Sequence, residues 1–207
     1  IRDGEVHWSD DIAIPYAPML GCIGTAPAWG VPSTLPAGTH GGNMDIKQLT
    51  AGTRLMLPVF TEGALFSAGD AHYAQGDSEC CGTAVEMDCT LHVSFRLLKG
   101  EAARRGIRFP IFERDDYFTS PEMAAPRRFI AATGMCITEN GVNQSEDGTL
   151  ASRNALLNMI QLLMERGWSR EQAYCICSVS VDLKVSEVVD VPNFVVSAFL
   201  PLDIFED

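Results

Sequence analysis

Gly69-Asp70-Ala71-His72-Tyr73-Ala74-Gln75-Gly76-Asp77-Ser78-Glu79 is the stretch that decides how this chain is interpreted. It gathers Asp, His, Gln and Glu side chains directly after an apolar run at 63–68. A strand that leads into a glycine-punctuated loop crowded with oxygen and nitrogen donors is typical of a metal or acid–base site. In an extended segment Asp70 and His72 point to the same side, because strand side chains alternate. The alternative is an acidic surface turn with an incidental histidine.

Composition describes an ordinary soluble globular chain. Its 207 residues are 46% hydrophobic and 20% charged, enough for one sizeable core. The net charge of −12 argues against nucleic acid or an anionic membrane as a partner, because phosphate binding needs clustered Lys and Arg. No apolar run reaches the roughly 18 residues that a membrane span requires.

The cysteines indicate a reducing compartment. An odd number of them, without any CxxC motif, predicts reduced thiols in a cytoplasmic protein, mostly small core side chains. Neither the adjacent pair nor the alternating pair has zinc-ligand spacing. The seven are Cys22, Cys80, Cys81, Cys89, Cys136, Cys175 and Cys177.

Apolar patterning predicts several strands. Buried strands are expected at 54–60 and 64–68, and a long β-like run at 80–98. A further strand is expected at 129–138, where Gly134 would permit a bulge. A polar extended arm at 2–8 and a closing strand pair at 185–190 and 194–200 complete the list.

Two helices are expected between these last strands. Apolar residues recur at helical spacing from Leu156 to Leu163, with Gly167 as a stop. Ser169 and Gln172 form a capping box for a second helix. The fold is therefore expected to be mixed α and β and rich in β, with two helices near the C-terminus packed on a sheet.

Several further segments carry a family resemblance, in the same order and at similar spacing. They are Gly41-Gly42-Asn43-Met44-Asp45, Leu55-Met56-Leu57-Pro58-Val59, Cys81-Gly82-Thr83-Ala84-Val85-Glu86 and Asp182-Leu183-Lys184-Val185-Ser186-Glu187-Val188-Val189-Asp190. Together with the opening stretch they resemble the acetamidase/formamidase family of amide hydrolases, and the fold is expected to be acetamidase/formamidase-like. One departure is Ser78, where the family usually has glycine.

The resemblance implies a longer protein, because family members carry a further N-terminal region. On this interpretation 1–40, rich in Pro and Gly, is an arm that contacts the missing N-terminal half, and 41–207 is the C-terminal catalytic region. The expected partners are the N-terminal fragment of the same precursor and further copies in an oligomer. Ile1 carries no nucleophile, so any cleavage would be maturation.

The function that the resemblance implies is hydrolysis of a carbon–nitrogen bond in a small amide. Formamide, acetamide or a cyclic amide such as a γ-lactam would be the substrate. The reaction needs a nucleophile, a polarised carbonyl and a proton for the amine. A divalent metal, zinc or alternatively calcium, would activate water, with Asp45, Asp70 and His72 as ligands.

Three carboxylates are candidates for the catalytic base or for further ligands, namely Glu86, Asp77 and Glu79. Burial of Glu86 on its predicted strand would raise the pKa of the carboxyl group, whereas the solvent face of that strand would not. The candidates for substrate binding are Asn43, Gln75 and Gly42. His40 could be a second imidazole or a solvated loop residue. The aromatic candidates for the pocket are Trp8, Trp29, Phe66 and Tyr73.

Two rival functions stay open. A non-catalytic, metal-stabilised subunit would use the same cluster only to hold the fold. A thiol-dependent amidase would use Cys80 or Cys81 as its nucleophile. A serine nucleophile has less support, because no GxSxG motif is present.

Overall fold

The computed structural model describes residues 5–31, 33–114, 128–188 and 194–205. The chain forms two compact units. Unit 1 comprises Ile1–Tyr16, Ala74–Val85 and Ser120–Asp207, and unit 2 comprises Ala17–Tyr73 and Glu86–Thr119. The predicted mixed, strand-rich fold is confirmed. Among the described residues, none of the helices combines the length and apolarity that crossing a bilayer requires.

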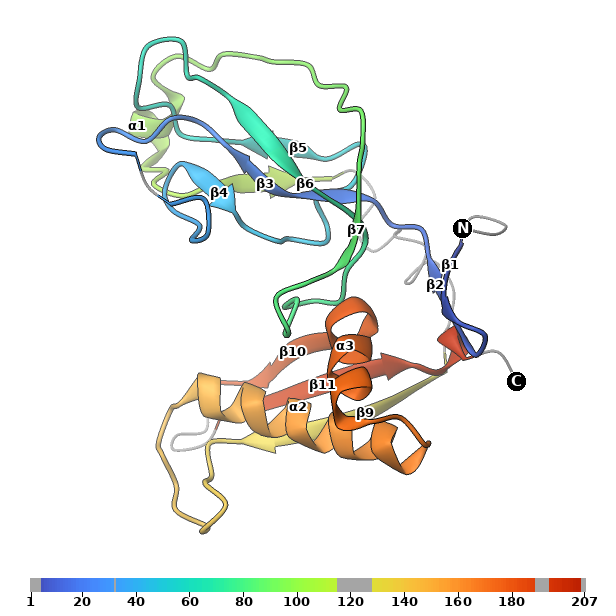
Figure 1. Ribbon diagram of the computed structural model, residues 1–207. Coiled ribbons are helices and arrows are strands. Elements are labelled where there is room, and N and C mark those ends of the chain that lie inside the picture. The colour runs from blue at the N-terminus through green and yellow to red at the C-terminus, as the bar shows by residue number, and fades with distance from the viewer. Residues whose placement is uncertain (1–4, 32, 115–127, 189–193, 206–207) are drawn as a thin grey trace. The chain divides into compact units, whose positions relative to one another are not determined.

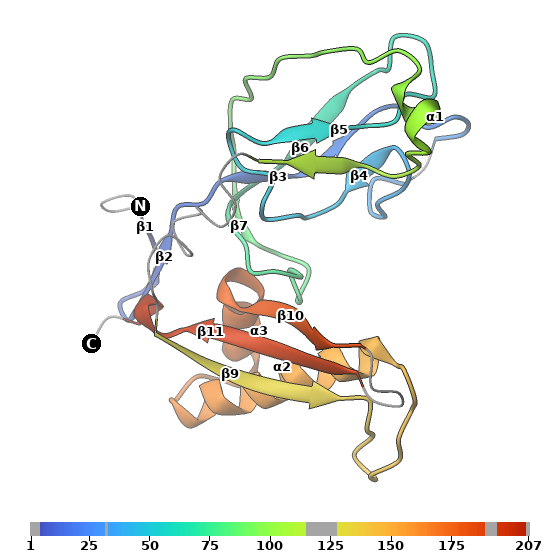
Figure 2. The ribbon, with the colours of Figure 1, turned by 180° about the vertical axis from the view of Figure 1, so that it is seen from behind.

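Unit 1 is built on a three-stranded antiparallel sheet. Its order is β10 (Asp182–Glu187), β11 (Val195–Pro201) and β9 (Phe129–Met135). Helices α2 (Gly148–Glu165) and α3 (Arg170–Ser180) lie in front of this sheet in Figure 1 and behind it in Figure 2. Both helices therefore cover the same face, which confirms the predicted packing of two C-terminal helices on a sheet.

The two helices form for the reasons that the sequence indicated. Helix α2 buries a stripe of residues spaced by four, Ala151, Ala155, Met159 and Leu163, all fully inaccessible. Helix α3 begins at the predicted capping box. There the Gln172 backbone N–H donates to Ser169 Oγ at 3.2 Å, and the Ser169 N–H donates to Gln172 Oε1 at 2.9 Å.

A hairpin and a short 3-10 helix complete unit 1. Strand β1 (Glu5–Ser9) pairs antiparallel with β2 (Ile12–Pro15), and η1 (Leu202–Ile204) follows β11. Trp8 packs edge-on against Trp168, with ring centroids 5.7 Å apart. Residues 2–4 of the predicted arm and 189–190 of the predicted closing strand lie outside the described residues.

Unit 2 contains two small sheets and a short helix. Strand β3 (Met19–Gly24) is antiparallel to both β4 (Gly41–Asn43) and β6 (Ser67–Ala74), so it lies between them. The remaining elements are β5 (Arg54–Met56), β7 (Val85–Met87), α1 (Glu101–Arg105) and β8 (Ile111–Glu113). The larger sheet has the order β4-β3-β6-β7, and β5 pairs with β8. Ala74 and Val85, at the ends of β6 and β7, belong to unit 1.

Several strand predictions for this part of the chain were wrong. The expected run at 80–98 is a strand only in β7, and residues 88–98 have no regular structure. The strand expected at 64–68 lies instead at β6, because Ala64 and Leu65 adopt left-handed backbone with φ of 58° and 48°. Asp70 and His72 are therefore part of the strand itself and not of a loop after it.

Gly134 marks a close approach of backbone and not the bulge that was predicted. The register between β9 and β11 is continuous from Phe129 to Met135. A Cβ on Gly134 would overlap the backbone oxygen of Ala151 and the backbone nitrogen of Ala155. Glycine is therefore what lets α2 lie directly on β9.

Gly134→Ala should lower the free energy of unfolding by about 1–3 kcal/mol or more, because backbone on both sides must move apart. Denaturant unfolding of purified protein measures this. Ala131→Ser, on an exposed position of the same strand, should change it by no more than about 0.5 kcal/mol. Equal stability of Gly134→Ala and the parent would contradict the close-packing account.

Candidate metal and catalytic site

The candidate site is centred on His72 of β6. The His72 side chain is 1% exposed, and its Nε2 lies 3.2 Å from Asp70 Oδ1 and 3.5 Å from Glu86 Oε2. Asp70 is on the same strand, and Glu86 is on the neighbouring strand β7. One ligand atom from each of these residues lies within 4.8 Å of the others. An imidazole nitrogen with two carboxylates at this separation is an arrangement that can hold a cation.

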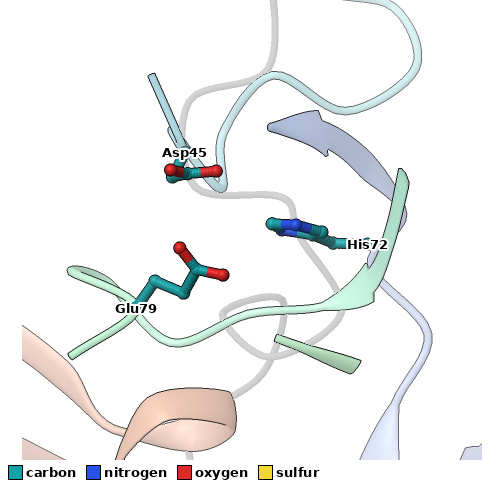
Figure 3. A group of neighbouring side chains, drawn as sticks. All are labelled: Asp45, His72 and Glu79. Carbon is teal, nitrogen blue, oxygen red and sulfur yellow. The ribbon is translucent and has the colours of Figure 1, made fainter. Parts of the chain in front are cut away.

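Asp45 approaches the same imidazole from the segment that follows β4. One of its carboxylate oxygens lies within 4.8 Å of a ring nitrogen of His72. Figure 3 shows these two side chains lying toward one another. Glu79, also drawn there, belongs to unit 1. The three predicted metal ligands, Asp45, Asp70 and His72, are therefore neighbours within unit 2.

A glycine makes room for the two aspartates. Gly21 lies in β3 opposite Asp70, since the β3–β6 register continues on either side of this pair. A Cβ on Gly21 would overlap both Oδ1 of Asp45 and Oδ2 of Asp70. Two carboxylates from separate segments thus converge over the backbone of Gly21. Any side chain at position 21 would occupy the space between them.

The backbone at both aspartates is unusual. Asp45 has φ 48° and Asp70 has φ 59°, so each adopts the left-handed conformation. Such a conformation costs of order 1–3 kcal/mol per non-glycine residue and is concentrated at functional sites. Both residues whose carboxylates meet over Gly21 therefore carry this cost.

A hydrogen-bond chain connects the aspartates to their surroundings. Asn43 Nδ2 donates to Asp45 Oδ2 at 2.8 Å. The Cys22 thiol donates to Asn43 Oδ1 at 2.9 Å and lies 3.7 Å from Asp70 Oδ2. Asn43, predicted to bind substrate, thus also braces a predicted metal ligand. Sequence reasoning missed Gly21 and Cys22, because strand pairing, and not local spacing, brings them to their partners.

The other predicted residues lie in varied surroundings. Of the two alternatives left open for Glu86, the exposed one holds, because its side chain is 51% exposed. Asp77 belongs to unit 1, where its N–H donates to Asp182 Oδ1 and its Oδ2 is 3.7 Å from Lys184 Nζ. Gln75 is 4% exposed, and Gly42 has φ 91°. Their catalytic and substrate-binding roles stay predictions.

The remaining candidates are His40 and the aromatic residues. The His40 ring is beside Gly38 and Gly42, and among the described residues it joins no group of potential metal ligands. Trp29 is 86% exposed, and Tyr73, at 3%, is part of the core. Phe66 packs edge-on against Phe95, with centroids 4.9 Å apart.

Comparison with known proteins gives this cluster a context. The profile of the Acetamidase/Formamidase family matches residues 30–207. The chain belongs to the acetamidase/formamidase family. The formamidase of Methylophilus methylotrophus is 37% identical over 176 residues, which are 84% of this chain and 42% of that protein. The acetamidase of Mycolicibacterium smegmatis is 39% identical over 154 residues, 71% of this chain and 36% of that protein.

A solved structure supports the same fold. The γ-lactamase from Delftia acidovorans superposes with a TM-score of 0.80 at 28% identity, over 96% of this chain and 60% of that one. The acetamidase/formamidase-like fold predicted from the sequence is thereby confirmed. This family member spans about two fifths of the length of the two curated relatives.

The thiols of this acetamidase/formamidase chain near α3 are poorly suited to nucleophilic attack. Burial, with a smaller contribution from the neighbouring Cys81, raises the pKa of Cys80 to about 12. Burial also raises the pKa of Cys177. Because the thiolate is the reactive form, a thiol that keeps its proton to such a high pH is inert near neutrality. The rival role of Cys80 as a nucleophile therefore loses support.

Because folding raises the pKa of Cys80, the free energy of unfolding is expected to fall as pH rises through the alkaline range. The unfolded thiol titrates near 9.0 and the folded one near about 12, so the folded state holds the extra proton between these values. The contribution is complete below pH 9.0 and is lost as pH rises toward about 12. Urea unfolding at a series of pH values should show this decline weakened in Cys80→Ala and unchanged in Cys89→Ala, an exposed control. Identical declines in parent and Cys80→Ala would contradict the assignment.

Proposed function

We propose that this chain carries the metal-dependent active site of an amidase that hydrolyses the carbon–nitrogen bond of small amides. The substrate class is formamide, acetamide or a cyclic amide such as a γ-lactam. The observation that carries the proposal is His72 Nε2 lying 3.2 Å from Asp70 and 3.5 Å from Glu86. Membership of the family and the names of the relatives, formamidase, acetamidase and γ-lactamase, support it.

The donor set fits a divalent cation, for which zinc is the first choice and calcium the alternative. Zinc binds imidazole nitrogen and carboxylate oxygen in tetrahedral sites. His72, Asp70 and Asp45 offer these atoms, and the glycine at position 21 leaves space where both carboxylates converge. When bound, such an ion supplies Lewis acidity to the amide carbonyl and to an attacking water.

Glu86 is the strongest of the three proposed catalytic carboxylates. Its carboxylate is close to His72, yet half of the side chain is exposed, so it can meet a water and a substrate. In the proposed reaction it accepts the proton of the attacking water and returns it to the departing amine nitrogen. Asp77, near Lys184, and Glu79, with a left-handed φ of 46°, stay candidates for this role or for a further ligand.

Substrate binding is proposed for Asn43, Gln75 and Gly42. An amide nitrogen carries two N–H donors, and the Asn43 amide uses one of them on Asp45. The second donor can bind the substrate carbonyl oxygen. Gln75, buried directly after β6, and the backbone at Gly42 are the remaining proposed contacts.

The proposed partners are the N-terminal fragment of the same precursor and further copies of the assembled protein. Exposed apolar side chains support the proposal that a partner covers this chain, since large exposed apolar patches mark interaction sites. In unit 2 these include Val31, Leu35, Phe95 and Leu97, which are 99%, 79%, 71% and 66% exposed. Seven free cysteines support a cytoplasmic, reducing compartment.

Elemental analysis of untreated protein should find about one zinc or similar ion per chain, the content of a single site. His72→Ala should lose the ion together with turnover, whereas His92→Ala, at an exposed position, should keep both. Fully active protein with less than a tenth of the expected metal, by the same single-site count, would contradict the proposal.

The same variant separates the rival functions. Loss of turnover with thermal stability retained supports a catalytic site, whereas unfolding that accompanies metal release supports a purely structural cluster. A thiol-dependent amidase would be inactivated by iodoacetamide and would be indifferent to chelators.

Glu86→Gln should lower kcat by roughly two to four orders of magnitude, the usual contribution of positioned proton transfer, with little change in KM. Asp88→Asn, a nearby exposed carboxylate, is the matched control. If Glu86→Gln keeps activity within about threefold and Asp77→Asn does not, the base is Asp77; if both keep it, neither takes part.

A further inference from the structure

Cys22 lies at the point where the two aspartate-bearing segments meet. In the sheet of unit 2 it is the register partner of Asn43 on β4 and of Gly69 on β6. Asp45 follows Asn43 closely, and Asp70 follows Gly69 directly. One cysteine on the central strand β3 therefore has both segments beside it.

From this position the Cys22 thiol makes contacts that reach both aspartates. The Asn43 amide must turn its Nδ2 toward the Asp45 carboxylate, because a carboxylate only accepts. Oδ1 of Asn43 then faces the Cys22 thiol, which donates to it at 2.9 Å. The same sulfur lies 3.7 Å from Asp70 Oδ2. The thiol is thus in contact with one aspartate directly and with the other through Asn43.

We propose that Cys22 is a positioning residue of the amidase site. Its thiol anchors the Asn43 amide through the amide oxygen, and Asn43 in turn holds the Asp45 carboxylate toward His72 before a cation or substrate binds. The inference rests on the function proposed above. Partners of this kind, which orient metal ligands without touching the metal, typically change metal affinity by 10–100-fold.

The donor, and not the volume, of Cys22 is what this role requires. Without the S–H group, the Asn43 oxygen loses its donor, so the amide is held less firmly in the position from which its Nδ2 binds the Asp45 carboxylate. Cys22→Ser keeps a donor, Cys22→Ala removes it, and Cys22→Val removes it while filling the space. A packing role would instead rank the variants by size.

The test is the affinity for zinc, measured by competition with a chromophoric chelator. It uses the protein as purified, with every polypeptide that accompanies it. Cys22→Ala should bind zinc roughly 10–100-fold more weakly, Cys22→Ser within about threefold of the parent, and the exposed control Cys89→Ala like the parent. Should Cys22→Ala be too unstable to purify, Cys22→Val replaces it with the same expected loss.

A double-mutant cycle tests the route through Asn43. If Cys22 acts through this amide, Cys22→Ala should weaken zinc binding little further in an Asn43→Ala background, because coupled residues are not additive. Full additivity of the two losses would overturn the inference.

The remaining outcomes separate the inference from the function on which it rests. Zinc bound by the parent, with unchanged affinity in Cys22→Ala or equal losses in Cys22→Ala and Cys22→Ser, overturns the positioning role and leaves the proposed function standing. A parent that binds no metal overturns both.

Discussion

Three carboxylates around one buried imidazole are the constraint on which the rest of unit 2 depends. Asp45, Asp70 and Glu86 all approach His72. Two like charges about 4 Å apart repel by about 4 kcal/mol at the effective dielectric of a partly buried site. A fold that concentrates this charge needs a compensating positive charge, and a proton on His72 or a bound cation can supply it. The net charge of the whole chain is −12, so the rest of the protein does not supply an excess of positive charge.

Backbone conformation is the means by which the charge is concentrated. Gly21 leaves space beneath the two aspartates, and both adopt left-handed φ values that favour glycine. Strand β3, paired on both sides, holds the segments in place while they bear this cost. Ser78, in unit 1, also has a left-handed φ, of 98°, a conformation that favours glycine, so serine is strained there by about 1 kcal/mol or more.

Local signals were predictable from the sequence, and long-range ones were not. The capping box of α3 and the apolar stripe of α2 are encoded within a few residues, so both helices were found. His72 and Asp70 are two positions apart, so their pairing was also visible. Asp45 was reached only through the family resemblance. Cys22 and Gly21 acquire their roles through strand pairing, which spacing does not reveal.

The wrong expectations have a related origin. Residues 88–98 alternate between polar and apolar side chains, but this pattern alone does not form a strand. A strand also needs a neighbouring strand with which to pair. The exposure of Glu86, which the sequence left open, likewise depends on what packs against its strand, and half of its side chain meets solvent. What the sequence lacked in both cases was the identity of the neighbour.

The division of β6 into an exposed and a buried half bears on the choice of metal. Residues 67–70 are exposed and 71–74 are buried, so the imidazole is fixed in the core while the Asp70 carboxylate, 35% exposed, can adjust. Calcium takes an all-oxygen shell of about six to eight ligands, and His72 cannot swing aside to leave one. A rigid nitrogen donor beside adjustable carboxylates suits a borderline ion that accepts nitrogen and oxygen at low coordination number. For the proposed metal site, the burial of one histidine is therefore an argument for zinc over calcium.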